Sequence, residues 1–260
     1  MVHTLKLYAV VAFLAANCAS GVHRESPPAA TPIAVAPDTI WLIFVDDLHL
    51  DFRKTGRLRS LLTVISTELI RDVDMFAVAS SGPSNLSIDV TADRTRLDTA
   101  IQSASGAGLS VADIVRPTRR PPAFDEVEYR AAVALSAAQK LLTSVEHVKS
   151  RRRAAIYISH GYNFDPIPGS PDKTTAATAR LRLQFSALTA GARRAGVRIF
   201  AVDLPGIPAD YPNIARAALD TYLATTQKNL RTMCEQTGGF AQSDGQNFSE
   251  MVKRVSSAMR

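Results

Sequence analysis

Acidic and histidine side chains follow one apolar segment, WLIFVDDLHLDF, at residues 41–52. Asp46 and Asp47 come directly after the apolar run, and His49 and Asp51 follow at alternate positions. Carboxylate oxygens and imidazole nitrogens can ligate metal ions or transfer protons. Alternate residues of an extended backbone share one face, so Asp47, His49 and Asp51 would lie together. We therefore take these residues as candidate binding residues, with Asp46 and Asp47 as candidate metal ligands.

Two later apolar segments end in polar groups of the same kind. RRRAAIYIS ends in Ser159, which is followed by His160, and GVRIFAVDL carries Asp203 near its end. In open parallel sheets, ligands bind at the carboxyl ends of the strands, near the point where the strand order reverses. We therefore add Ser159 and His160 to the candidate binding residues and expect Asp203 at the same edge.

Two interpretations of these side chains are open. Asp47, His49 and Asp51 together with His160 would make a set of two histidines and two carboxylates, which suits zinc, manganese or iron better than magnesium. In the structural interpretation, Asp46 and Asp47 accept hydrogen bonds from backbone N–H groups of neighbouring loops. His49 and Asp51 would then lie exposed before the next helix.

The segments that must position these residues alternate between apolar runs and amphipathic stretches. Residues 39–45 are almost continuously apolar, which is typical of a strand buried on both faces. Predicted strands cover residues 39–45, 74–81, 84–90, 151–159, 196–204 and 238–243, and predicted helices cover 56–73, 91–104, 125–148, 175–195, 222–236 and 248–259. This alternation predicts an α/β fold of three layers, with a mostly parallel central sheet flanked by helices on both faces.

The longest stretch without periodicity, residues 103–122, is rich in Gly and Pro and predicts a mobile loop. Together with residues 46–51 and 160–172 it would form the binding edge. Arg116, Arg119 and Arg120 in this stretch could contact an acidic protein partner.

Other chemistry finds little support in the chain. There is no G-x-x-x-x-G-K-[ST] phosphate loop and no G-x-S-x-G elbow for a serine nucleophile. The arginines have no interleaved aromatic side chains on which bases could stack, so the sequence does not predict nucleic-acid binding.

The first twenty residues predict a secretory signal peptide. Lys6 supplies the positive charge, residues 7–16 form a short apolar region, and small residues follow. Cys18 stands where a lipoprotein cysteine would stand, so a lipid anchor at Cys18 and ordinary cleavage near residues 19–21 are both open. The sequence thus predicts an exported protein in the periplasm, the cell envelope or the extracellular space.

Residues 21–38 are rich in Pro and Ala and predict a linker, so residues 39–260 form the folded domain. A chain of 260 residues with 46% hydrophobic and 21% charged residues is an ordinary globular composition, and its net charge of +6 is mildly basic. Beyond Cys18 only Cys234 remains, so a packed core must stabilise the domain without an internal disulfide. No segment after the signal is long and apolar enough to predict a transmembrane helix.

The order of four segments resembles the von Willebrand factor type A (VWA) domain, in particular a bacterial exported VWFA-related branch. The segments are WLIFVDDLHLDF, AAIYISHGYN, RRAGVRIFAVDL and LRTMCEQTGGFAQS. They match the first, fourth and fifth strands and the terminal helix–strand unit of that Rossmann-like fold. The resemblance implies a protein-binding or adhesion module over nearly all of the chain after the linker.

The same resemblance implies a metal-ion-dependent adhesion site that is degenerate in this chain. Asp46 matches the leading aspartate, but Leu48 and Leu50 stand where the family has serines. His160 replaces an aspartate, and no threonine lies at residues 125–128. We therefore predict a non-catalytic module that binds a protein partner at the cell envelope, with a divalent cation (Mg, Mn or Zn) as an open question. The alternative is a metal-dependent hydrolase that uses Asp46, Asp47, His49 and His160.

Overall fold

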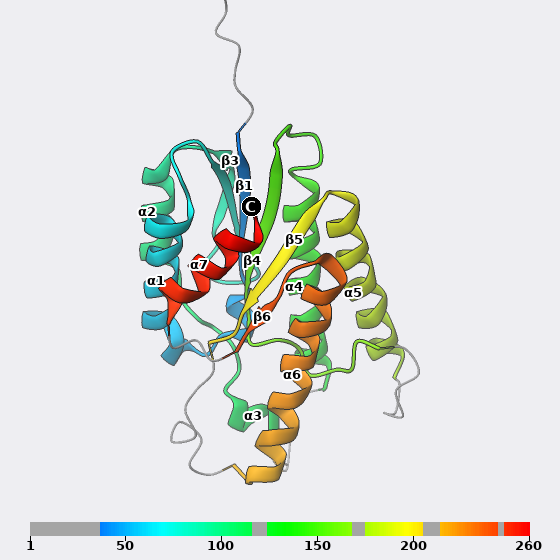
Figure 1. The fold of residues 1–260 in the computed structure, drawn as a ribbon. Coiled ribbons are helices and arrows are strands. Elements are labelled where there is room, and N and C mark those ends of the chain that lie inside the picture. Colours follow the sequence, from blue (N-terminus) through cyan, green and yellow to red (C-terminus); the bar gives the residue numbers. More distant parts are fainter. Residues whose placement is uncertain (1–36, 116–123, 168–174, 205–213, 244–246) are drawn as a thin grey trace, which may run out of the picture. The chain divides into compact units, whose positions relative to one another are not determined.

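The structure is a computed structural model that describes residues 37–115, 124–167, 175–204, 214–243 and 247–260 (Figure 1). The predicted signal peptide, almost all of the predicted linker, the loop arginines Arg116, Arg119 and Arg120, and residues 168–172 of the predicted binding edge lie outside the described residues. Among the described residues, no helix is long and apolar enough to cross a membrane.

A six-stranded sheet with the order β3-β2-β1-β4-β5-β6 forms the centre of the domain. The strands are β1 (Thr39–Val45), β2 (Met75–Ser80), β3 (Ser87–Thr91), β4 (Arg152–Ile158), β5 (Val197–Val202) and β6 (Ala241–Gln242). All neighbouring strands pair in parallel except β2 and β3, which pair antiparallel at one edge. The predicted mostly parallel sheet is therefore confirmed.

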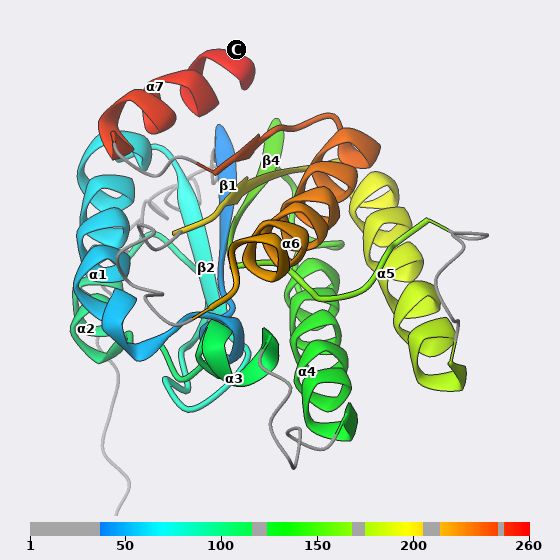
Figure 2. The same ribbon diagram turned by 90° about the horizontal axis from the view of Figure 1, so that it is seen from below.

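Helices cover both faces of this sheet (Figure 2). They are α1 (Thr55–Val64), α2 (Arg94–Ser103), α3 (Val111–Val115), α4 (Phe124–Thr143), α5 (Ala176–Arg194), α6 (Arg216–Thr237) and α7 (Phe248–Ala258). One hydrophobic cluster joins the sheet to α1, α2 and α7, and a second joins it to α4, α5 and α6. The predicted three layers are confirmed.

Strand β1 supplies both clusters, because its side chains alternate between the two faces. Trp41, Ile43 and Val45 enter the cluster with α1, α2 and α7, whereas Leu42 and Phe44 enter the cluster with α4, α5 and α6. All seven residues of β1 are buried, as the continuous apolar run predicts. The acidic residues that follow β1 are therefore held by the most buried strand of the sheet.

Several helix boundaries differ from those predicted. The segment predicted as one helix over residues 56–73 is the α-helix α1 followed by a π-helical turn, Ile65–Leu69. Helix α6 begins at Arg216, before the predicted start at residue 222, and ends where Gly238 adopts a left-handed φ of 78°. Asp93 caps α2, since its side chain accepts a hydrogen bond from the backbone N–H of Thr95.

The stretch predicted as a mobile loop is ordered over its first part. Val111–Val115 forms α3, which packs against Leu219 and Tyr222 of α6. Ahead of α3, the backbone N–H groups of Ala107 and Gly108 donate to the carbonyl oxygens of Asp47 and Leu50, both at 2.8 Å. The prediction of a mobile loop is therefore wrong for residues 104–115, because these bonds hold the segment against the end of β1.

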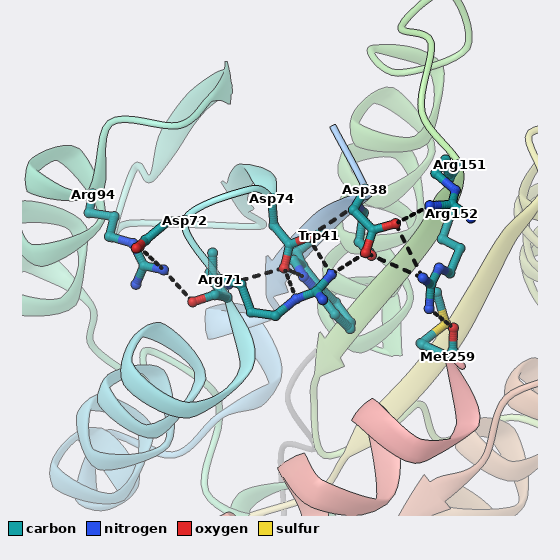
Figure 3. A network of polar contacts seen from close by, with 11 residues as sticks. Asp38, Trp41, Arg71, Asp72, Asp74, Arg94, Arg151, Arg152 and Met259 are labelled. Carbon is teal, nitrogen blue, oxygen red and sulfur yellow. Dashed lines mark hydrogen bonds and ion pairs between the residues drawn. The ribbon is translucent and has the colours of Figure 1, made fainter. Parts of the chain in front are cut away.

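A charged network holds the opposite, amino-terminal end of the sheet (Figure 3). The buried carboxylate of Asp74 accepts hydrogen bonds from the backbone N–H of Thr39 (3.1 Å) and the indole N–H of Trp41 (3.2 Å). Arg71 bonds both Asp74 and Asp38, and Arg152 joins Asp38 to the carbonyl oxygen at the end of α7. The network thus joins the starts of β1, β2 and β4 to the C-terminal helix.

Candidate functional site

The candidate residues lie at the carboxyl end of the sheet, where the strand order reverses. The chain leaves β1 toward β2 on one side, and β4 pairs on the other side of β1. Asp46 follows β1, Ser159 follows β4, and Asp203 follows β5. The backbone N–H of Asp46 donates to the carbonyl oxygen of Ile158 (2.9 Å), so the two strand ends are joined directly. This is the position at which open α/β sheets bind ligands.

The carboxylate of Asp46 is completely buried and binds three side chains. Its Oδ1 accepts from the hydroxyl of Ser81 at 2.8 Å and lies 2.9 Å from Nδ1 of His49. Its Oδ2 accepts from the hydroxyl of Ser159 at 2.7 Å. Ser159 in turn accepts from the backbone N–H of Gly161 at 3.0 Å. Both oxygens of Asp46 are therefore used within the protein.

These contacts determine in which direction the pKa of each buried group shifts. Burial by itself would raise the pKa of Asp46, but the charge of His49 and the hydrogen bonds from His49, Ser159 and Ser81 outweigh it and lower the pKa. Burial and the charge of Asp46 raise the pKa of Tyr157 and Tyr162, whose hydroxyl groups bond each other. Asp46 is thus an ionised carboxylate surrounded by neutral hydroxyl groups.

Asp47 accepts hydrogen bonds from the segment after β2. The hydroxyl of Ser81 lies 3.0 Å from its Oδ1, and the backbone N–H of Ser84 lies 2.8 Å from its Oδ2. Asp47 to His49 forms a 3₁₀ turn rather than extended backbone. The expectation that Asp47, His49 and Asp51 share one face of an extended segment is therefore wrong, because the tight turn rotates successive side chains differently.

His49 and Asp51 are each paired locally. His49 bonds Asp46, packs edge-on against the ring of Tyr162 at 4.9 Å, and is only 12% exposed. Asp51 accepts from Arg53 at distances of 2.6 to 3.2 Å and caps the short 3₁₀ turn Phe52–Lys54. The structural interpretation of the sequence is right about the backbone bond to Asp47. It is wrong about Asp46, which bonds side chains, and about His49 and Asp51, whose side chains are only 12% and 16% exposed.

A second acid–histidine pair lies beside the first. Nδ1 of His160 is 2.8 Å from Oδ1 of Asp203, and both residues are buried. The ring of His160 lies against the ring of Tyr222 in α6, with centroids 5.7 Å apart. Burial lowers the pKa of His160, but the charge and hydrogen bond of Asp203 outweigh it and raise the pKa above its ordinary value of 6.5. His160 is therefore disposed to carry a proton.

A small pocket opens over the second pair. Apolar side chains from the loop after β1, from α3, from α4 and from the end of β5 line it, among them Leu48, Leu109, Ile114, Val127 and Leu204. Its polar lining comes from His49, Asp51, Lys54, Arg130, His160 and Tyr222. The pocket is small, with a cavity volume of about 30 Å³. Apolar walls with a few convergent polar groups are the usual composition of a binding pocket.

The candidate metal ligands do not converge on one point. Within the described ranges, no group of three or more His, Cys, Asp and Glu side chains is arranged to hold a metal ion. Asp46 and His49 bond each other, while His160 bonds Asp203 instead. Leu48 and Leu50 offer no ligand atoms. The donor set therefore does not fit a hard divalent cation, which needs several free oxygen ligands.

The sequence did not point to most of the residues that complete these clusters. Ser81 directly follows β2 and could have been found by the same argument that selected Ser159, which directly follows β4. Asp203 was expected at this edge, but its pairing with His160 was not. Lys54, Arg130 and Tyr222 reach the pocket from helical segments, and no local sequence pattern distinguishes them from the other polar and aromatic residues of those segments.

Comparisons with known proteins add little to this geometry. No protein-family model and no curated protein matches the chain. Among solved structures, the chain is similar to the VWA domain of SpRpn10, with 13% identity over 85% of this chain and 95% of that chain and a TM-score of 0.42. The α/β class rests on the strand order and pairing described above. The resemblance to the VWA family itself remains a prediction from the sequence.

Proposed function

We propose that the chain is an exported, VWA-like binding module of the VWFA-related branch, with a degenerate metal site, and that it binds a protein partner at the cell envelope. The observation that carries this proposal is the apolar pocket at the carboxyl ends of β1 and β4, between Leu48, Leu109, Val127 and Leu204. It lies at the switch point of the sheet, which is the usual ligand position in this class of fold. The partner would place a small group into the pocket.

The contacts of the acidic residues favour binding over catalysis. The hydroxyl of Ser159 donates to Asp46 and not to His160, and Nε2 of His160 has no hydrogen-bond partner among the described residues, so no nucleophile is bonded to this base. Both oxygens of Asp46 are bonded within the protein. We infer that Asp46 and Asp47 hold the strand ends together.

A peptide selection tests the binding role. Peptides selected from a random library against the purified protein should shift the backbone amide signals of Leu48, Leu109 and Val127. Val127→Trp, which fills the pocket from α4, should abolish their binding. Ser136→Trp, at an exposed position on the same helix, should leave it intact. Peptides that bind Val127→Trp as tightly as the parent would place the interaction elsewhere and contradict the proposal.

The alternative, a metal-dependent hydrolase that uses Asp46, Asp47, His49 and His160, predicts bound metal. Elemental mass spectrometry of the purified parent beside an Asp46→Ala, Asp47→Ala variant tests it. We expect no stoichiometric metal in the parent and no change in melting temperature with added magnesium, manganese or zinc. One equivalent of metal in the parent that is lost in the variant would favour the hydrolase.

Export is proposed on the sequence of the first twenty residues. When a bacterium produces the full chain, we expect the purified protein to start near residues 18–21 and to be found outside the cytosol. A lipid on Cys18 of the parent that is absent from the Cys18→Ser variant would show anchoring. Cleavage at the same residue in the parent and in the variant would show ordinary secretion. A cytosolic protein that retains Met1 would contradict export.

A further inference from the structure

Basic side chains gather at the amino end of the sheet, beside the starts of β4 and β5. Arg153 donates to the carbonyl oxygen of Ala195 at 2.8 Å and also to that of Val148. The segments that lead into the two strands therefore lie side by side, as the strands themselves do. Four exposed residues of these segments form what we call the amino-end basic cluster: Lys149, Arg151, Arg193 and Arg194.

The described residues around this cluster do not neutralise its charge. The side chains of Lys149, Arg193 and Arg194 make no hydrogen bond or ion pair within the described ranges. Arg151 is 77% exposed, and its guanidinium lies 3.7 Å from the carboxylate of Asp38. That carboxylate also bonds two further arginines of the network in Figure 3, so one negative charge is shared among three positive ones. The cluster therefore presents positive charge to solvent.

The acids at this end do not reverse the sign of the charge. Some are matched by arginines or cap a helix, namely Asp38, Asp72, Asp74 and Asp93. Of the other described residues there, Glu146 before β4 and Glu235 near the end of α6 are exposed acids. Besides the cluster, Arg153 and Arg198 add positive charge, because their guanidinium groups bond uncharged carbonyl groups. The amino end is therefore net positive and attracts anionic surfaces.

One apolar side chain is exposed beside these charges. Val73 is 61% exposed, and its carbonyl oxygen accepts from the backbone N–H of Asp38 at 3.2 Å, next to Arg151. Apolar side chains among basic ones are typical of segments that lie on membranes. The exposed aromatic residues of the described ranges, Phe52 and Tyr129, lie at the opposite end of the sheet. Bases of a nucleic acid would thus find no stacking partner beside the cluster.

The chain enters the domain at this same end. Pro37 is the first described residue, and its carbonyl oxygen accepts from the backbone N–H of Arg151 at 3.4 Å. Figure 1 shows the start of β1 beside the segment that leads into β4. A residue of extended chain spans at most about 3.6 Å, so a lipid on Cys18 would hold the cluster within about 70 Å of a membrane. Such a tether raises the concentration of headgroups that the cluster meets.

We propose that the amino end of the domain rests on an anionic phospholipid surface, with the amino-end basic cluster against the headgroup phosphates and Val73 at the interface. This inference rests on the export proposed above and names the surface that the exported domain meets. Each Lys or Arg that reaches anionic headgroups strengthens binding about fivefold. The pocket lies at the opposite end of the sheet, so a domain bound in this way presents it away from the membrane.

Vesicle sedimentation with the purified full chain tests the proposal. The probes are vesicles of phosphatidylglycerol and phosphatidylcholine in equal parts, and neutral vesicles of phosphatidylcholine alone. At low salt we expect at least about tenfold tighter binding to the anionic vesicles than to the neutral ones. High salt should remove most of this difference, because mobile ions screen exposed charges.

Two variants with equal loss of charge locate the binding surface. The cluster variant carries Lys149→Gln, Arg193→Gln and Arg194→Gln, and should bind anionic vesicles at least about tenfold more weakly. The control variant changes exposed arginines at the opposite end of the sheet, namely Arg53→Gln, Arg180→Gln and Arg216→Gln, and should bind within about twofold of the parent. A lipid on Cys18 or a retained signal peptide is common to all three proteins and cannot cause the difference.

A single change keeps the proposal testable if the cluster variant does not fold. Val73→Glu places a negative charge on the same surface and should weaken binding to anionic vesicles about fivefold or more. Equal binding of the parent to both kinds of vesicle, or an equal loss in the cluster and control variants, would overturn the proposal. So would binding of poly-glutamate that the cluster variant loses while anionic vesicles are not preferred, because the cluster would then contact an acidic protein.

The outcomes separate this inference from the proposed function. An exported protein that binds selected peptides in its pocket but ignores anionic vesicles would refute the lipid surface alone. A cytosolic protein that retains Met1 and binds anionic vesicles through the cluster would refute export and leave the lipid surface in place.

Discussion

At the scale of single residues, Asp46 is a buried carboxylate that joins three segments of the chain. Ser81, Ser159 and His49 reach it from the ends of β2 and β4 and from the turn after β1. Its charge is offset within the protein, so its removal would leave several buried donors without an acceptor. Such a residue stabilises the strand ends more than it offers a free ligand.

The first prediction is that Asp46→Ala destabilises the protein by about 3 kcal/mol, because it leaves Ser159 and His49 without their acceptor in a buried site, whereas Ser81 can still donate to Asp47. Urea unfolding followed by circular dichroism measures the loss. Asp98→Ala, at an exposed position of α2, is the matched control and should leave the unfolding free energy within experimental error. Equal effects of the two changes would show that the Asp46 network contributes nothing specific.

The second prediction concerns the pair of His160 and Asp203. Folding raises the pKa of His160 above its unfolded value of about 6.5. The pair with Asp203 therefore stabilises the fold fully below that pH. This stabilisation is lost as the pH rises through the pKa of His160 in the folded protein. Asp203→Asn should lower the pKa of His160 and remove this pH-dependent part.

Ring-nitrogen NMR and urea unfolding between pH 5 and pH 9 measure both effects. The difference in unfolding free energy between parent and Asp203→Asn should be largest at the acidic end and should shrink as the pH rises. A difference that grows with pH would mean that His160 is neutral in the folded protein.

At the scale of elements, the pocket depends on how closely one segment lies on another. Residues 105–108 lie against the loop after β1, where Asp51 and Gly108 form an isolated parallel bridge. A Cβ atom on Gly106 would come within 2.4 Å of the carbonyl oxygen of Leu50 and 2.5 Å of that of Asp51. Because Gly106 has no Cβ atom, residues 105–108 can lie directly on the backbone of Leu50 and Asp51, and this contact places Leu109 and α3 over the pocket.

The third prediction follows from this contact. Gly106→Ala should cost about 1–3 kcal/mol through overpacking, weaken the bonds of Ala107 and Gly108 to the loop, and reduce ligand binding. Gly56→Ala is the matched control, because its Cβ would meet nothing within 4 Å in α1 and should stabilise by up to about 1 kcal/mol. Thermal unfolding and the amide shifts of Leu50 distinguish the two. A Gly106→Ala protein with unchanged stability and shifts would contradict the close packing.

At the scale of the described domain, the two ends of the sheet are built differently. The carboxyl end holds the buried acid–histidine pairs and the pocket, whereas the amino end is tied by the network of Asp38, Arg71, Asp74 and Arg152 (Figure 3). The arginines of that network bond Asp38 and lower its pKa. Changes at the amino end should therefore affect stability without changing the pocket.

The fourth prediction tests that separation. Asp74→Ala should destabilise the protein by about 3 kcal/mol, because the buried donors of Thr39 and Trp41 lose their acceptor. Its effect on the binding of selected peptides in the pocket should be negligible. The adjacent Asp72 is the control, since its side chain is 99% exposed and Asp72→Ala should change neither property. A loss of binding in folded Asp74→Ala would show that the two ends are coupled.

The sequence by itself determined the fold class and most of the helices and strands. The apolar run of residues 39–45 and the alternation of strands and helices are local patterns, and backbone geometry alone makes them predictive. The same patterns selected Asp46, Ser159, His160 and Asp203 as strand ends. They did not show that Asp47 to His49 forms a tight turn or that residues 104–115 are ordered, because contacts from distant segments fix both.

Only the tertiary structure decided which polar groups meet. Ser81 lies 35 residues from Asp46, Ser159 lies 113 residues from it, and Asp203 lies 43 residues from His160. Such partners are set by the order in which strands pair, and the periodicity of a single strand carries no information about its neighbours. Strand order therefore bonds His160 to Asp203 and places His160 among the residues that line the pocket.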